Sequence, residues 1–244
     1  MGTSKSFGSM KGNPQWPKLS SSVTINCIGG SIPDPKVRRI LSNYVATIGS
    51  ASKAKSGKSG PFGRAGIKTA GKFAGFIGVF ESSGRDLGFA LAETGLVELK
   101  GKTAADIINH LIEYCSGPSA TIDDHAAKAA SQALLEELAQ NAKSVEELQD
   151  MLKKALDEYS LEEILLRYFG YYIYEHLATF FYEKLIKEKG KTKCSNLFKH
   201  IKCFIFEKLK EINKKNPLKD MKWGTPQSLK LITKLQNDVL KVFA

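Results

Sequence analysis

The pattern of amphipathic helices runs through most of this chain and limits its possible folds more than any other feature. From residue 101 onward, apolar side chains recur every three or four positions with few interruptions. Two S-x-x-E sequences, Ser144–Glu147 and Ser160–Glu163, have the form of capping boxes that open helices. Strand signals are confined to two short stretches, 23–28 and 96–99. We therefore predict an all-α fold, a multi-helix bundle.

The helix expected after Ser160 contains an aromatic cluster at residues 168–174, followed by Phe180-Phe181-Tyr182. A helix that is apolar on nearly every side is either central to a bundle or half-buried in an interface with a partner. Both interpretations stay open. Charged residues such as Arg167 and Glu175 interrupt the cluster and exclude a membrane-spanning segment.

The first 32 residues have a different composition, in which glycine, serine and proline interrupt any periodicity. We predict that residues 1–32 form a flexible N-terminal tail, because Pro14 and Pro17 disfavour a regular helix. Trp16 is an apolar residue within this polar stretch. It either docks the tail into a groove of a partner or packs on the core of its own chain.

Residues 33–100 are predicted to be a basic, glycine-rich helical region. A helix should begin with Asp34 as its cap and Pro35 in its first position, and end near Gly49. A basic linker follows at 50–64, and then a helix rich in small residues at Ala65–Phe80, where another helix can approach closely. Residues 101–244 are predicted to form a helical domain.

The net charge of +11 is unevenly distributed along the chain. Counted by segment, it is +9 over residues 1–100, −8 over 101–188 and +10 over 189–244. Such a chain can present faces of opposite sign to different partners. Nucleic-acid binding through the basic ends stays open as an alternative, although a nucleic-acid-binding domain usually has one continuous positive face.

The residues reveal no complete catalytic, cofactor or metal motif, so we predict a protein that is not an enzyme. Gly57-Lys58-Ser59 matches the end of a phosphate-binding loop, but Ser52 stands where the first glycine is required. Cys194, His200 and Cys203 are three ligands where a structural zinc site needs four. The four cysteines are widely spaced, which favours a reducing cytoplasm over a disulfide framework.

The helix at Ala65–Phe80 supports an alternative function, in which the chain acts on membranes. Lys68 and Lys72 lie one turn apart, as expected for a basic amphipathic surface. The apolar side of that surface comprises Phe73, Phe76, Ile77 and Phe80.

The start of the chain offers a further chemical group. Removal of Met1 would expose the amine of Gly2, and Met-Gly-Thr-Ser-Lys-Ser also has the loose M-G-x-x-x-[S/T] form read by N-myristoylation enzymes. An unhindered amine at the end of a tail is a nucleophile that a modifying enzyme can admit. The alternative is an ordinary chain terminus without a function.

The opening residues resemble the start of the QatB proteins of bacterial Qat anti-phage systems, which are encoded beside an ATPase, a QueC-like enzyme and a TatD-like nuclease. The resemblance covers about seventy residues and extends into the basic stretch Lys55–Gly78. It is carried by Met1-Gly2-Thr3-Ser4, Gly8, Lys11-Gly12, Pro14, Trp16 and Pro17.

This resemblance implies a non-enzymatic, cytoplasmic component of a defence complex that binds the QueC-like enzyme, with the ATPase and the TatD-like nuclease as further candidate partners. It also implies that Gly2 is the acceptor of a 7-deazaguanine-type group, joined through an amide bond. Thr3, Ser4 and Trp16 would then be the contacts with the channel of the enzyme, and Trp16 would also anchor the tail.

Overall fold

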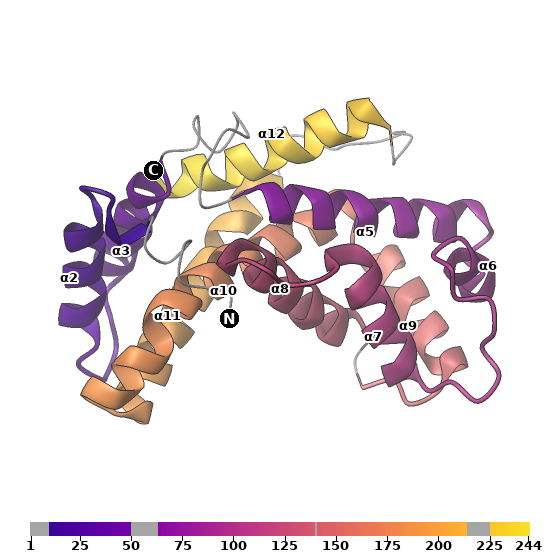
Figure 1. Cartoon of the computed structure of the whole chain (residues 1–244), viewed down its shortest axis with the longest axis horizontal. Helices are drawn as coiled ribbons and strands as arrows, with labels where there is room; N and C mark the ends of the chain where they lie inside the picture. Colours follow the sequence, from indigo (N-terminus) through magenta and orange to yellow (C-terminus); the bar gives the residue numbers. More distant parts are fainter. Residues whose placement is uncertain (1–9, 50–62, 140, 214–224) are drawn as a thin grey trace.

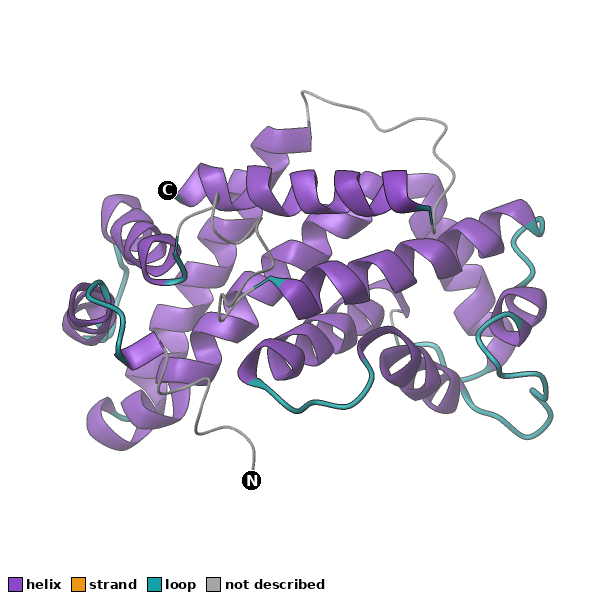
Figure 2. Cartoon of the chain, turned by 45° about the horizontal axis from the view of Figure 1, so that its top comes forward, coloured by secondary structure: helices purple, strands orange, loops and turns teal. Residues whose placement is uncertain are grey.

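The computed structural model describes residues 10–49, 63–139, 141–213 and 225–244. Within these ranges all regular secondary structure is helical, which confirms the predicted all-α bundle (Figures 1 and 2). The helices are α2 (Trp16–Asn26), α3 (Asp34–Thr47), α5 (Arg64–Ser82), α6 (Leu87–Ala92), α7 (Ala104–Ser116), α8 (Ile122–Ala139), α9 (Val145–Glu158), α10 (Leu161–Lys189), α11 (Lys191–Asn213) and α12 (Pro226–Phe243).

Helix α10 is the centre of the bundle. It is 29 residues long and has buried side chains on every side, among them Phe169, Ile173 and Leu177. Its main neighbours are α8 and α11, and it also contacts α5 and α12. The aromatic cluster is therefore a core helix, as one of the two interpretations predicted, because an apolar surface of this extent must be removed from water.

The other helices cover α10 from both ends of the molecule. Figure 1 shows α12 lying along α5 at the top, with α6, α7 and α9 at one end and the pair α2 and α3 at the other. The pair α2–α3 forms a helical hairpin, whose connection contains Gly29 and Gly30 at φ values of 83° and 85°. One hydrophobic core includes side chains from Met10 to Phe243.

Glycines allow close contact in three pairs of helices, which are α5 with α10, α10 with α11 and α5 with α12. A Cβ on Gly66 of α5 would lie 2.6 Å from Cζ of Tyr172, and one on Gly170 of α10 would lie 2.7 Å from Cδ1 of Leu209. A Cβ on Gly71 would lie 3.0 Å from Cδ2 of Leu229 in α12. Gly66 and Gly71 of α5 thus have the close-packing role predicted from the sequence, whereas a Cβ on Gly75 would meet nothing within 4 Å.

The prediction of a flexible tail over 1–32 is wrong for residues 16–26, which form α2. Leu19 and Val23 on one face of this helix are fully buried. Pro17 is tolerated because it lies in the first turn, where the missing N–H would have no intrahelical partner. Residues 1–9 lie outside the described residues.

Several smaller expectations also need correction. The stretches 23–28 and 96–99 are not strands, since the first belongs largely to α2 and the second has no regular structure. Asp34 is the first residue of α3 rather than its cap, which is Pro33. Helix α5 begins at Arg64, inside the predicted linker, whose residues 50–62 lie outside the described part of the chain. The short helix α6 was not expected.

Candidate functional site

The N-terminal segment is attached to the body of the molecule at three described residues. Trp16 stacks on Phe181, with ring centroids 5.2 Å apart, and meets Phe180 edge-on at 5.7 Å. The side-chain amide of Asn13 donates a hydrogen bond of 2.6 Å to the carbonyl of Thr47, at the end of α3. Met10 is fully buried. Of the two interpretations of Trp16, the structure therefore shows packing on its own chain.

The predicted acceptor Gly2 and its neighbours Thr3 and Ser4 lie outside the described residues, so the structure does not bring them together with Trp16. The chain length still sets a limit on their reach. Eight residue steps separate Gly2 from Met10, and an extended chain of that length spans at most about 29 Å. The Cα of Gly2 must therefore lie within that radius of the Cα of the buried Met10.

A cluster of polar groups lies beneath this attachment, where α3, α8 and α10 meet the start of α5. The hydroxyl of Tyr44 and Nδ1 of His176 are hydrogen-bonded at 2.9 Å, and both residues are fully buried. One turn earlier in α10, the hydroxyl of Tyr172 donates a hydrogen bond to the carboxylate of Asp123.

The Asp123 carboxylate fixes the first turn of α5. It accepts hydrogen bonds from the backbone N–H of Gly63 at 3.1 Å and from that of Ala65 at 2.9 Å, a position where a negative charge is favourable for a helix. Burial nevertheless raises the pKa of Asp123 above its ordinary value, and the hydrogen bonds oppose that shift only in part. This role was not expected, because in the sequence Asp123 resembles an ordinary acidic residue at the start of a helix.

A groove of about 330 Å³ opens on another side of α10, next to α11 and the ends of α8 and α9. Its lining includes an ion pair between Arg167 and Glu137, and the hydroxyl of Tyr171 donates to Glu137 at 2.8 Å. The guanidinium of Arg167 also lies 4.2 Å from the ring centroid of Tyr159, and the ammonium of Lys202 lies 4.7 Å from that of Tyr171. Burial and the nearby Glu137 carboxylate raise the pKa of Tyr171.

This groove is lined by aromatic and charged side chains together. Glu137 is paired with Arg167 and Tyr171 within the fold, and the lining also includes Glu163, Lys202 and Lys210. Phe206 packs edge-on against Tyr171 at 4.8 Å and completes an aromatic wall.

Candidate metal ligands do not converge in the described parts of the chain, where no group of three or more His, Cys, Asp or Glu is placed to hold an ion. The buried thiol of Cys194 points to the carbonyl of Tyr182 at 3.5 Å, whereas Cys203 is exposed. His200 instead contacts the carbonyl of Asn196, 2.9 Å away.

The membrane-active surface expected on α5 is turned inward. Phe73, Phe76, Ile77 and Phe80 are each at most 2% exposed. The ammonium of Lys72 donates to the carbonyl of Tyr114 at 2.6 Å. Among the helices described, none has the length and apolar character needed to cross a bilayer.

Comparison with known proteins identifies one family. The model of the QatB family, described as Qat anti-phage system associated protein QatB, matches residues 62–243, which comprise α5 to α12. No curated protein and no solved structure matches the chain. The matched range lies mostly downstream of the residues that carry the resemblance noted in the sequence, and the two overlap in the basic stretch that leads into α5. The chain therefore belongs to the QatB family of proteins associated with Qat anti-phage systems.

Proposed function

We propose that this chain is a non-enzymatic component of its anti-phage system that binds the QueC-like enzyme and offers Gly2 as the acceptor of a 7-deazaguanine-type group. Membership of the QatB family supports a role in defence. The observation that carries the proposal is the attachment of the N-terminal segment through Met10, Asn13 and Trp16, which ties the acceptor to a folded body.

The proposed reaction needs only an amine from this chain. The enzyme activates a carboxylate with ATP, and the amine of Gly2 attacks the activated carboxyl carbon. An amide bond forms, the activating nucleotide leaves, and the amine gives up a proton. Thr3 and Ser4 contact the channel of the enzyme in this proposal. Because the activation step uses ATP, we also assign the reaction to the cytoplasm.

Trp16 contributes indirectly, by fixing where the tail leaves the body. Because the Cα of Gly2 stays within about 29 Å of that of Met10, the catalytic centre that modifies its amine must lie within roughly that reach. The ATPase and the TatD-like nuclease are further partners in this proposal, held by other surfaces of the helical body.

The test is the intact mass of the protein purified with and without the neighbouring QueC-like enzyme. We expect a mass increase that requires the enzyme and that fragmentation assigns to Gly2. Gly2→Glu should abolish the increase, because a large charged residue at the second position prevents removal of Met1, whereas Gly8→Ala should keep it. An unmodified Gly2 in a stable complex with the enzyme would contradict the acceptor role.

A further inference from the structure

A second groove, of about 520 Å³, runs along the outer face of the α2–α3 hairpin, and we call it the hairpin groove. The groove lies between the two helices of the hairpin. The carbonyl of Lys18 in α2 accepts a hydrogen bond of 3.4 Å from the side chain of Asn43 in α3. Its lining comprises Pro17, Lys18, Ser21, Ser22, Ile25, Asn26, Lys36, Arg39 and Asn43.

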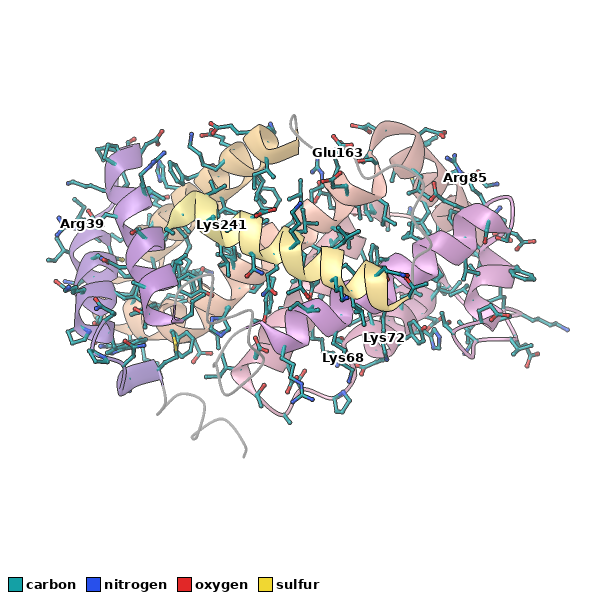
Figure 3. All side chains as sticks on the ribbon, turned by 90° about the horizontal axis from the view of Figure 1, so that it is seen from above. Arg39, Lys68, Lys72, Arg85, Glu163 and Lys241 are labelled. Carbon is teal, nitrogen blue, oxygen red and sulfur yellow. The ribbon has the colours of Figure 1, made fainter. Side chains whose placement is uncertain are left out.

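The charge of the hairpin groove has one sign. Lys18, Lys36 and Arg39 are exposed, and no acidic side chain is among the lining residues. None of these three cations forms an ion pair within the parts of the chain that the structure describes. Figure 3 shows Arg39 at the end of the molecule that α2 and α3 form. The hairpin groove is therefore complementary to a negatively charged surface.

The hairpin groove also offers an apolar contact. Ile25, which is 66% exposed, lines it, and Ile28 just beyond the end of α2 is 61% exposed. Exposed isoleucines next to unpaired cations suit a protein segment with both carboxylates and an apolar anchor. Nucleic acid would use the cations but leave the isoleucines without a function.

The hairpin groove lies beside the point where the N-terminal segment joins the body. Its Pro17 end follows directly after Trp16, and Asn43 lies one turn before Thr47, which accepts the hydrogen bond from Asn13. Helix α2 has 11 residues and is about 16 Å long, so a protein bound anywhere along the hairpin groove is within reach of the tail.

From these observations we propose that the hairpin groove is the docking surface for an acidic segment of the QueC-like enzyme that carries an apolar anchor residue. This inference rests on the proposed function, because it takes the same enzyme as partner. Docking here would hold the enzyme next to the tail, so that modification of Gly2 becomes a reaction within a complex.

The test measures the affinity of the full chain for the purified enzyme by titration calorimetry at low and moderate salt. The groove variant, Lys36→Glu with Arg39→Glu, should weaken binding about tenfold or more, because it replaces attraction by repulsion. The control, Lys68→Glu with Lys230→Glu, changes the net charge by the same amount on α5 and α12, outside the hairpin groove, and should change affinity less than about twofold.

Ile25→Ala tests the apolar contact separately, without a change of charge, and should also weaken binding, with a loss that depends less on salt than that of the charge variant. Circular dichroism and thermal unfolding of each variant verify that the hairpin remains folded. Both groove residues and control residues are exposed, so we expect similar Tm values for all of them.

The outcomes separate this inference from the proposed function. Equal loss of affinity in the groove and control variants, while Gly2 is still modified, would overturn the docking surface and leave the acceptor role intact. Binding that depends on the hairpin groove without any modification of Gly2 would support the docking surface and contradict the acceptor role. Loss of binding to a short duplex DNA, with enzyme binding unchanged, would overturn the inference in favour of nucleic acid.

Discussion

Replacement of Gly66 by alanine should destabilise the fold strongly, because α5 touches the ring of Tyr172 at this point. The added Cβ would lie 2.6 Å from Cζ and 2.8 Å from Cδ1 of that ring. The ring cannot easily move, since Tyr172 is fully buried and its hydroxyl is hydrogen-bonded to Asp123 and, at 3.1 Å, to the backbone N–H of Gly63.

The size of the effect follows from these contacts. Overpacking costs about 1–3 kcal/mol, and each weakened hydrogen bond of Tyr172 adds about 1 kcal/mol. We expect Gly66→Ala to lower the free energy of unfolding by about 3 kcal/mol, which corresponds to a fall of roughly 6–12 °C in Tm for a chain of this size. Urea unfolding followed by circular dichroism at the helical band measures the difference.

Gly75 provides a matched control in the same helix. A Cβ at Gly75 would meet nothing within 4 Å, so Gly75→Ala should stabilise the protein by up to about 1 kcal/mol through helix propensity alone. If Gly66→Ala proved as stable as Gly75→Ala, the argument that α5 and α10 are in direct contact at Tyr172 would be refuted.

Three other substitutions test separate parts of the structure. Trp16→Ala should lower the free energy of unfolding by about 2 kcal/mol, because it removes the half-buried ring that stacks on Phe181. Trp16→Phe should restore part of this free energy. Burial raises the pKa of Asp123 in the folded state above its value in the unfolded chain. The folded state therefore binds the proton more tightly, which stabilises the fold at low pH. This stabilisation is lost as the pH rises from about 4 through the raised pKa. A pH series of unfolding free energies should therefore show a decline that Asp123→Asn lacks, and an identical decline in both proteins would contradict this assignment. Ser160→Ala should cost about 1 kcal/mol by removing the capping box of α10, as thermal unfolding would show, and no change would mean that the cap is not needed.

The features that the sequence predicts correctly depend on neighbouring residues. Ser144 and Ser160 each accept a hydrogen bond from the N–H three residues later, and the helices begin where the S-x-x-E pattern places them. Helix α12 likewise begins at Pro226, after a cap by Thr225. Such signals act within one turn, and a single sequence contains them in full.

The errors arise where distant residues decide the structure. Pro17 and the surrounding glycines indicate a tail, yet Leu19 and Val23, one turn apart, are buried because α3 and the body cover them. That spacing was the available signal for α2. The contact of Asp123 with the start of α5 joins residues about sixty positions apart, and no local sequence pattern predicts it.

The contact of the hairpin with α10 has a consequence for the choice of fragments of this protein to express. The family match begins at residue 62, whereas the partners of Phe181 and His176 are Trp16 and Tyr44, which precede it. A fragment that starts at the matched range would present an aromatic ring and an imidazole to water where the full chain buries them. Expression of the matched range alone should therefore give an aggregation-prone product, and the smallest unit suited to crystallisation or reconstitution includes the hairpin.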